Sequence, residues 1–382
     1  MKTKKIFIIA GEPSGDVLGG KIMAAIKAEN PAVEFVGIGG KNMQEQGLDS
    51  LFDIAELSIM GFLEVLPHIP KLLKRINQTA QNIIDSKADL VLTIDSPDFC
   101  FRVIKKIKNH AIKKAHLIAP SVWAYREKRA QKVAKLYDLL LAILPFEPPY
   151  FEKYGLKTVF IGHPIVEGHY TVTTKQLLEF QQKQQIKEDD LIICATAGSR
   201  IGEVKRILPE IIKAANILAE KYSNLKILLP VIAKTKNLVE EHLNQFNCPV
   251  QIVEEDNKYL AFKSARLAIA KSGTNNLEIA IYQLPLITIY KINPLTHFLI
   301  KMMVKIKFAN LINLILNRAV IPELLQNDCT GEKISQTANH LIANPKIAQN
   351  QIDEAKNVLK MLGLNAKIKP SKKAALEIVS QL

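Results

Sequence analysis

The feature that most constrains the fold is an alternation of short apolar runs with helical patterns, which occurs twice along the chain. The first series predicts strands at Lys5–Ala10, Glu34–Gly37, Leu90–Ile94, His116–Ile118, Leu139–Leu144 and Thr158–Ile161. The second predicts strands at Leu191–Ala195, Lys226–Leu229, Val250–Val253, Leu267–Ala270 and Leu286–Ile289. A polar, Gln-rich stretch over 175–185 separates the two series. This pattern predicts an α/β protein with two doubly wound, Rossmann-like domains that face each other across a cleft.

The break between the two series sets the expected domain boundary. Gly162-His163-Pro164 ends the first series, and 382 residues suit two domains. We expect an N-terminal domain over residues 1–168 and a C-terminal domain over 169–344. The end of the chain has a helical pattern, and the last helices of two-domain proteins of this build often return to the first domain. We therefore assign the helices over about 345–382 to the N-terminal domain.

The chain is strongly basic, with a formal net charge of +14. Between Phe99 and Lys135 it has eleven Lys or Arg residues and a single acid, Glu127. Such an excess suits nucleic acid, an anionic membrane surface or phosphorylated substrates, and it also suits plain solvated helix faces. Aromatic residues make up 6% of the chain and no nucleic-acid-binding motif occurs. Nucleic acid is therefore not an expected partner.

The cysteines and histidines indicate neither disulfides nor a metal site. The four cysteines lie far apart in the sequence with no C-x-x-C, which suits a reducing cytosol. The eight histidines show no H-E-x-x-H spacing. We expect no metal and no cofactor. No apolar run approaches the roughly 20 residues that a membrane-spanning helix needs, and the first apolar run is too short for a signal peptide.

The first strand runs directly into a small-residue loop, Gly11–Asp16, and a helix is expected from near Val17. A loop at the carboxyl end of a strand is where doubly wound domains bind ligands. Its spacing matches neither G-x-G-x-x-G nor the P-loop. The loop predicts a ligand site without identifying the ligand.

Two carboxylates come after the strand Leu90–Ile94, in the segment Asp95-Ser96-Pro97-Asp98. At the carboxyl edge of the sheet, a carboxylate can accept a proton from a substrate hydroxyl as a general base. We favour this role for Asp95, because an acid at a strand end is costly to bury without a purpose. For Asp98 we favour a cap of the following helix.

Two turns in the second half suit anions. Gly198-Ser199-Arg200 and Ser272-Gly273-Thr274 each lie between an apolar strand and a helix, and Glu278 lies one helical turn after the second. Backbone N–H groups at such positions bind phosphates, and Arg200 adds a bidentate donor. Glu278 could accept hydrogen bonds from two ribose hydroxyls. The alternative is that both turns are ordinary helix caps.

Two further stretches have two interpretations each. Leu57–Arg75 is apolar on more than one face and ends in basic residues. It predicts either a buried helix pair or a surface for a membrane or for acyl chains. In the second interpretation, the contact residues are Phe62, Leu63, Val65, Leu66, Ile69 and Leu72. The loop that contains Trp123, the single tryptophan, is either a cleft wall or part of the core.

In this order, the motifs resemble those of the lipid-A-disaccharide synthase family over nearly the whole chain. No single motif is decisive, but the ordered set is specific. The motifs are Gly11–Asp16, Gly37–Gly40, Met60-Gly61 with Glu64–Leu66, Asp95–Phe99, Pro120–Ala124, Leu144–Glu147, Gly162–Pro164, Gly198–Arg200, Ser272–Thr274 with Leu277-Glu278, and Glu323–Gln326.

The resemblance implies a GT-B glycosyltransferase, with the nucleotide-sugar bound by the C-terminal domain and the acceptor by the N-terminal domain. It implies the condensation of UDP-2,3-diacylglucosamine with 2,3-diacylglucosamine 1-phosphate, which gives the β-1,6-linked disaccharide 1-phosphate of lipid A and UDP. The family's essential acid falls on Asp95, its essential arginine on Arg200, and an asparagine near the nucleotide on Asn313. The expected nucleotide-sugar-binding residues are Gly198, Ser199, Arg200, Ser272, Gly273, Thr274, Glu278 and Asn313.

Residues and resemblance together predict one inverting displacement. Asp95 deprotonates the acceptor 6-hydroxyl, and Arg200 with the N–H groups of the two turns stabilises the leaving UDP without a divalent cation. The first loop then belongs to the acceptor side, and the expected acceptor-binding residues are Ser14, Gly15, Asp98 and Trp123.

The resemblance also implies a peripheral protein on the cytoplasmic face of the inner membrane of a Gram-negative bacterium, and it is compatible with a homodimer. Two other classes remain open from the residues alone. One is a different GT-B enzyme that uses a UDP-sugar, an epimerase or a transferase. The other is a non-enzymatic protein that binds anionic lipid.

Overall fold

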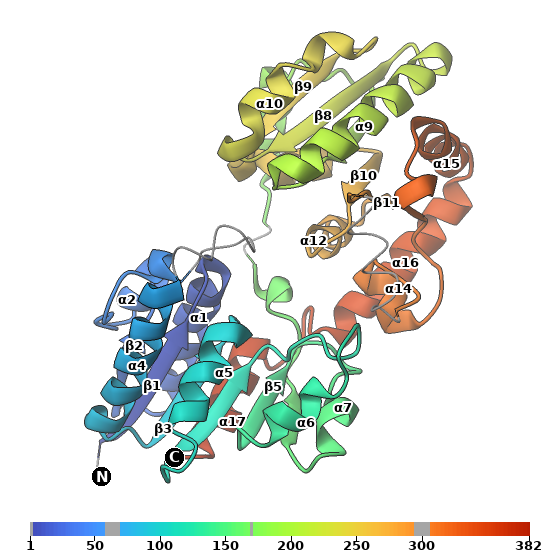
Figure 1. Cartoon of the computed structure of the whole chain (residues 1–382). Helices are drawn as coiled ribbons and strands as arrows, with labels where there is room; N and C mark the ends of the chain where they lie inside the picture. The colour runs from blue at the N-terminus through green and yellow to red at the C-terminus, as the bar shows by residue number, and fades with distance from the viewer. Residues whose placement is uncertain (1–2, 58–68, 169–170, 294–305) are drawn as a thin grey trace. The chain divides into compact units, whose positions relative to one another are not determined.

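The computed structural model describes residues 3–57, 69–168, 171–293 and 306–382. The chain forms two compact units (Figure 1). Unit 1 contains Met1–Glu167 and Leu362–Leu382, and unit 2 contains Gly168–Met361. The chain therefore passes from unit 1 to unit 2 and returns.

Unit 1 is built on a parallel sheet with the strand order β2-β1-β3-β4-β5-β6 in the described part of the chain. Its strands are β1 (Lys4–Ala10), β2 (Val33–Ile38), β3 (Leu90–Ile94), β4 (Lys113–Leu117), β5 (Leu139–Ala142) and β6 (Lys157–Phe160). Its α-helices are α1 (Pro13–Glu29), α2 (Lys41–Gln44), α4 (Ile69–Ser86), α5 (Pro97–Lys106), α6 (Arg129–Ala134), α7 (Pro148–Glu152) and α17 (Pro370–Val379). Short 3₁₀ turns cover Ile54–Glu56 and Pro164–Glu167.

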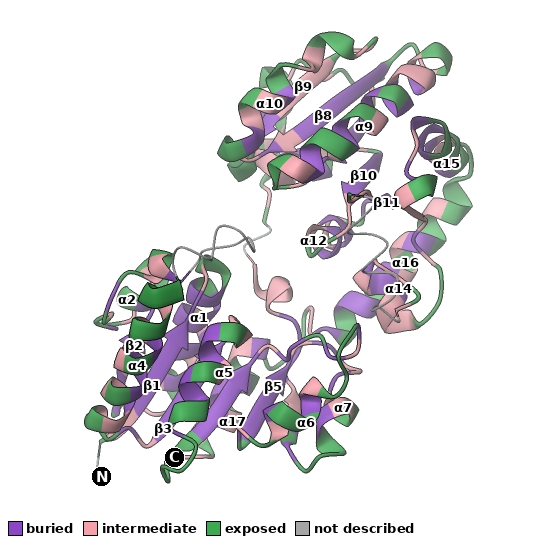
Figure 2. Cartoon of the chain, viewed as in Figure 1, coloured by how far each residue is buried: buried purple, intermediate pink, exposed green. Residues whose placement is uncertain are grey.

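Both faces of the unit 1 sheet are covered by helices. Ile6 and Ile8 of β1 lie in a core cluster with apolar residues of α1 and α17. Phe7 and Ile9, which alternate with them, lie in a second cluster with residues of α4, α5 and α6. The strands are accordingly apolar throughout, as expected for a parallel sheet that is buried on both faces. Figure 2 shows buried strands and helices with exposed outer faces.

Unit 2 repeats the plan, with the strand order β12-β11-β10-β7-β8-β9 and parallel pairing. Its strands are β7 (Leu191–Thr196), β8 (Leu225–Val231), β9 (Val250–Glu254), β10 (Leu267–Lys271), β11 (Leu286–Tyr290) and β12 (Glu323–Leu325). Its α-helices are α8 (Thr174–Lys183), α9 (Ile201–Lys221), α10 (Lys236–Glu240), α11 (Lys258–Ser264), α12 (Asn275–Ile281), α14 (Leu311–Leu316), α15 (Gly331–Ala343) and α16 (Pro345–Met361). Short 3₁₀ turns lie at Ala233–Thr235, Leu243–Gln245, Glu255–Asn257 and Gln326–Asp328.

The expected strands are all present, and the sheets confirm an α/β fold with two doubly wound units. The structure adds a short edge strand, β12, that the sequence pattern does not predict. β4 begins at Lys113, three residues earlier than predicted, because Lys114 is buried in the strand and its ammonium donates to the carbonyls of His110 and Ile112.

The chain returns to unit 1 later than the sequence predicts. α16 packs against α12, α14 and α15 and belongs to unit 2, so residues 345–361 are not part of unit 1. α17 packs against α1, where Ala374, Ala375 and Ile378 are fully buried in the unit 1 core.

Candidate functional site

In unit 2, the turn after β7 is shaped by a glycine and an acid. Gly198 has φ +117°, a conformation that side chains disfavour. A Cβ at this position would lie 2.7 Å from Oε2 of Glu203. The same oxygen accepts a hydrogen bond from the Ser199 N–H at 3.3 Å. The turn therefore wraps a carboxylate from the first turn of α9.

The turn after β10 lies beside it, because β7 and β10 are neighbours in register. Asn275 donates from Nδ2 to Thr196 Oγ1 at 3.2 Å and so joins the two turns. Ser272 donates from Oγ to the Ala309 carbonyl at 2.9 Å, which fixes the start of the second turn.

The two turns line a pocket of about 240 Å³. The lining brings together six of the predicted nucleotide-sugar-binding residues: Gly198, Ser199, Ser272, Gly273, Thr274 and Glu278. Polar groups at the carboxyl edge of an open α/β sheet are the usual setting of a ligand site.

Glu278 is fixed at the side of this pocket by two partners. Tyr259 donates its hydroxyl to Oε1 at 3.0 Å, and Lys258 lies 3.0 Å from Oε2. Burial lowers the pKa of Lys258, but its ion pairs with Glu255 and Glu278 outweigh this, so its pKa is raised overall. Burial, followed by the charge of Glu278, raises the pKa of the stacked Tyr282 to about 12. The pocket thus contains the carboxylate of Glu278, fixed by two contacts, beside Lys258, which remains charged.

Arg200 is the N-cap residue of α9, and its guanidinium lies at the surface. Its side chain is 69% exposed, and Nη1 lies 3.9 Å from Oε1 of Glu203. Arg200 is not among the residues that line the pocket, but it directly follows Ser199, which does.

Asn313 also lies outside the pocket lining, and its amide is used by the fold. It is fully buried, donates to the Ile321 carbonyl and to Glu323, and accepts from the N–H groups of Val320 and Ile321. Glu323 in turn accepts from the N–H groups of Ala309 and Asn310. Asn313 is therefore linked to the second turn through Glu323 and Ala309, because the Ala309 carbonyl accepts the hydroxyl of Ser272.

Sequence reasoning missed Glu203, Lys258, Tyr259 and Lys271. Lys271 ends the apolar strand β10, and its ammonium lies 3.0 Å from Oε1 of Glu203. A charged residue directly before the Ser-Gly-Thr turn was the available signal for Lys271. The acid four residues after Ser199 was the corresponding signal for Glu203.

In unit 1, the turn after β3 holds Asp95 in a rare backbone conformation. Asp95 and Ser96 have φ of +52° and +45°, in the left-handed region that few residues other than glycine adopt. The Asp95 N–H donates to the Leu117 carbonyl of β4 at 3.0 Å. A Cβ on Gly11 would lie 2.3 Å from Cβ of Ser96, so the glycine of the first turn makes room for this one.

The expected loop Gly11–Asp16 is shorter than predicted, because α1 begins at Pro13, a residue suited to a first helical position. Ser14 is exposed and Gly15 is buried against Ala10 and Ile94. Asp16 is not free for a ligand: it accepts from the N–H groups of Gly40, Asn42 and Met43, and from the Asn42 amide.

Asp98 is the second residue of α5 and is not its N-cap, so the capping role expected for it is wrong. Its side chain is 92% exposed and pairs with Arg129 at 3.1 Å.

Trp123 is held by a buried acid. Its indole N–H donates to Oε1 of Glu147 at 3.2 Å, and its ring packs edge-on against Phe146. Oε2 of Glu147 accepts from the N–H groups of Ile143 and Leu144. Burial raises the pKa of Glu147 to about 7, although these hydrogen bonds favour the ionised form. Trp123 is half-buried, so its burial alone does not distinguish a cleft wall from part of the core.

Four of the predicted membrane-contact residues, Phe62, Leu63, Val65 and Leu66, lie outside the described residues. Ile69 is 40% exposed at the start of α4, whereas Leu72 packs against the unit 1 core. Within the described ranges, no helix combines the length and the apolar character needed to cross a bilayer. In the same ranges, no group of three or more His, Cys, Asp or Glu side chains is arranged to hold a metal ion.

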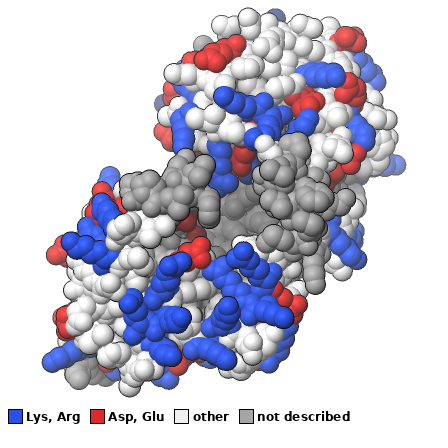
Figure 3. All heavy atoms as spheres, viewed as in Figure 1, with Lys and Arg blue, Asp and Glu red and all other residues white. Residues whose placement is uncertain are grey.

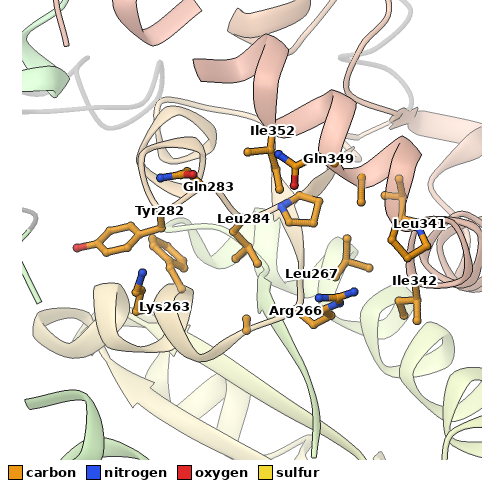
Figure 4. Close-up of a pocket in the computed structure, with 15 residues that line it drawn as sticks. Lys263, Arg266, Leu267, Tyr282, Gln283, Leu284, Leu341, Ile342, Gln349 and Ile352 are labelled. Atoms are coloured by element: carbon orange, nitrogen blue, oxygen red, sulfur yellow. The ribbon is translucent and has the colours of Figure 1, made fainter. Parts of the chain in front are cut away.

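A larger pocket, of about 300 Å³, lies at the opposite edge of the unit 2 sheet (Figure 4). It is lined by residues that precede β10 and β11, among them Arg266 and Leu284, and by residues of α16, among them Ile352. It contains none of the predicted site residues. Since ligands of open α/β sheets bind at the carboxyl ends of the strands, we assign the functional site to the smaller pocket.

The fold places the chain in a class. A UDP co-structure of MnaA from S. aureus matches with a TM-score of 0.63 at 16% identity, covering 98% of this chain and 95% of that one. A glycosyltransferase from Rickettsia africae matches with a TM-score of 0.60 at 14% identity, covering 100% and 99%. At such identities the likeness concerns the fold alone, and it is the GT-B fold of glycosyltransferases and epimerases.

The sequence identifies the family within that class. The model of the family described as lipid-A-disaccharide synthetase matches residues 6–379. The lipid-A-disaccharide synthase of Rhodospirillum centenum is 40% identical over 384 residues, covering 100% of this chain and 95% of that protein. That of Rickettsia bellii is 43% identical over 373 residues, covering 96% of each. The chain belongs to the lipid-A-disaccharide synthase family, as its motifs predict, and is a glycosyltransferase of lipid A biosynthesis.

Proposed function

We propose that this chain condenses UDP-2,3-diacylglucosamine with 2,3-diacylglucosamine 1-phosphate into the β-1,6-linked disaccharide 1-phosphate, with release of UDP. The observation that carries the proposal is the unit 2 pocket, in which two small-residue turns and a held carboxylate lie together in a member of this family. The turns suit a diphosphate, and Glu278 suits the ribose hydroxyls. Unit 2 is then the nucleotide-sugar domain and unit 1 the acceptor domain.

Asp95 is the general base of the proposed reaction. Its carboxylate takes the proton of the acceptor 6-hydroxyl, and the oxygen attacks the anomeric carbon of the donor in one inverting step. The left-handed turn supports this role, because strained backbone at a strand end is a feature of functional sites. Such a base contributes about a hundredfold to ten-thousandfold in rate.

The leaving UDP gains negative charge as the glycosidic bond breaks. Arg200 and the N–H groups of the two turns are suited to stabilise that charge, since donors fixed before the reaction need no reorganisation. In this mechanism the donors of the protein neutralise the charge that a divalent cation would otherwise neutralise, so the proposed reaction is metal-independent.

The acceptor contacts unit 1 near Ser14, Gly15, Asp98 and Trp123. Ser14 lies at the start of α1, where backbone N–H groups and the helix dipole favour a 1-phosphate. Trp123 offers a rigid ring that Glu147 holds in place.

We also propose that unit 1 docks on the cytoplasmic face of the inner membrane. Figure 3 shows Lys and Arg side chains gathered over the face of unit 1 that α5 and α6 form in Figure 1. The cations are exposed on both helices and their flanks, and among them are Arg102, Lys105, Lys106, Lys128 and Lys132. Ile69 and Leu73 on α4 add exposed apolar side chains. A surface of this kind suits anionic lipid headgroups.

The decisive experiment is incubation of the purified protein with the two acylated glucosamine substrates. We expect release of UDP and a tetraacyl disaccharide 1-phosphate by mass spectrometry, unchanged by EDTA. Conversion of UDP-N-acetylglucosamine into an epimer without a disaccharide would instead favour the epimerase class. Loss of turnover on addition of EDTA would contradict the metal-independent mechanism.

A further inference from the structure

An ion pair between a buried acid and a partly exposed lysine lies between the two turns of the unit 2 pocket. The ammonium of Lys271, at the end of β10, is 3.0 Å from Oε1 of Glu203, in the first turn of α9. The Lys271 ammonium also lies over the Tyr290 ring, 5.3 Å from its centroid. The pair therefore connects the strand end that carries the second turn with the helix that carries the first.

The carboxylate of Glu203 meets one donor from the first turn and one from the residue that precedes the second turn. Its side chain is 8% exposed, and it receives the Ser199 N–H on Oε2 and the Lys271 ammonium on Oε1. The Arg200 guanidinium lies 3.9 Å from Oε1. Gly198 is required because any side chain there would strike Glu203. The carboxylate of Glu203 thus brings together one N–H group of the first turn, the Lys271 ammonium and the Arg200 guanidinium.

We propose that Lys271 is a further residue that binds the UDP diphosphate, and that Glu203 is a positioning residue that holds its ammonium between the two turns. This inference rests on the proposed function of the pocket. When the glycosidic bond breaks, its electron pair passes to a β-phosphate oxygen of UDP, and the Lys271 ammonium stabilises that charge together with Arg200. No proton has to reach the departing diphosphate.

The Lys271–Glu203 pair differs from a purely structural ion pair in its solvent exposure and in its position at the pocket. Lys271 is one of the residues that line the pocket, and its side chain is 22% exposed. The pair of Lys226 with Asp190 has a similar length, 3.0 Å, but its two side chains are 9% and 12% exposed and neither residue lines that pocket. Lys226 therefore provides a matched control for the loss of a lysine from a salt bridge in the same unit.

The test compares UDP with uridine by isothermal titration calorimetry. In a Glu203→Gln background, which removes the buried charge, we add Lys271→Met so that no carboxylate is left unpaired. We expect the second change to weaken UDP binding about tenfold to a hundredfold, the usual effect of losing a hydrogen bond to a charged group. Uridine, which has no phosphate, should change less than about twofold, and Lys271→Arg should restore much of the UDP affinity.

Each result has one meaning. Equal UDP affinity with and without Lys271→Met, both in the otherwise unmodified protein and in the Glu203→Gln protein, would overturn the inference, because Lys271 would then serve only Glu203. Equal losses for UDP and uridine, or similar losses from Lys226→Met, would overturn it in favour of a general structural role. Failure of the unmodified protein to bind UDP would instead contradict the proposed function.

Discussion

In unit 2, the turn after β7 contains a glycine and wraps a carboxylate, whereas in unit 1 the turn after β3 places two non-glycine residues at φ of +52° and +45°. In the first turn the Ser199 N–H donates to the carboxylate of Glu203, which also pairs with Lys271. The second holds the proposed base, Asp95, in a left-handed backbone conformation. The same strand-end position thus has two different turn structures, and in the proposed mechanism these serve two chemical tasks.

The two units also differ in the partners of their carboxylates. In the unit 2 pocket the carboxylates of Glu203 and Glu278 are each matched by a lysine. In unit 1 the carboxylate of Glu147 accepts from the N–H groups of Ile143, Leu144 and Trp123, and burial raises its pKa to about 7. Substitutions in each unit can test this contrast, and a change to the proposed base should have the greatest effect.

Asp95→Asn should lower kcat by about a hundredfold to ten-thousandfold, because the amide cannot accept the proton. Asparagine tolerates the left-handed conformation, so the fold should be retained. UDP affinity, which in the proposed function depends on unit 2, should change less than about twofold by calorimetry. The control is Glu34→Gln on β2, which removes an exposed ion pair with Lys5 and should leave kcat within a few-fold. Near-normal turnover of Asp95→Asn would end the assignment of the base.

Gly198→Ala should weaken UDP binding by tenfold or more. The new methyl group would lie 2.7 Å from Oε2 of Glu203, at a φ of +117°. The control is Gly155→Ala, where φ is also positive, at +80°, but a Cβ would meet no atom within 4 Å. It carries the backbone strain alone, so UDP affinity should remain normal. If both variants bind UDP equally, the close approach to Glu203 is not important for the pocket.

The single tryptophan should report the protonation of Glu147. The ionised carboxylate accepts the indole N–H, and the protonated acid accepts it poorly, so Trp123 fluorescence should titrate with a midpoint near pH 7. The pKa of Glu147 is raised by folding, so its contribution to stability is present at low pH. That contribution is lost as the pH rises toward 7, and the loss is on the order of 3 kcal/mol.

Glu147→Gln is the matched variant for this titration. Its amide keeps the size of the side chain but does not titrate, so both the fluorescence transition and this part of the pH dependence of Tm should vanish. A transition that persists in the variant would assign the titration to another group.

Replacing Ile69 and Leu73 by Ser should lower binding to anionic vesicles by a few-fold in a flotation assay, since both side chains are exposed on α4. The control is Leu178→Ser on α8 of unit 2, whose side chain is 60% exposed. Equal losses from both changes would show that exposed apolar area, and not the unit 1 surface, sets the binding. Loss of the fold would favour the buried-helix interpretation.

The sequence predicts the strands well because each is a continuous apolar run in a sheet buried on both faces. It does not predict β12, whose three residues are all only partly buried and begin with Glu323. It also places the start of α1 four residues too late, because Pro13 and Gly15 look like a loop until Pro13 is seen at the first helical position.

The site is predictable only where a single segment carries the signal. The turns at Gly198 and Ser272 are visible as small residues between a strand and a helix. Lys271 and Glu203 are 68 positions apart in the sequence and meet only because β7 and β10 are neighbours in the sheet. The family resemblance assigns Asn313 to the nucleotide, whereas its hydrogen bonds are to the segment that carries Glu323.

The last helix has a consequence for how the protein is made. Residues 362–382 complete the core of unit 1, and α17 covers apolar positions that also contact α1. During synthesis the ribosome makes those residues after the whole of unit 2. Unit 1 therefore emerges first but is completed last. The face of its sheet that α1 and α17 share lacks α17 until the end of the chain has been made.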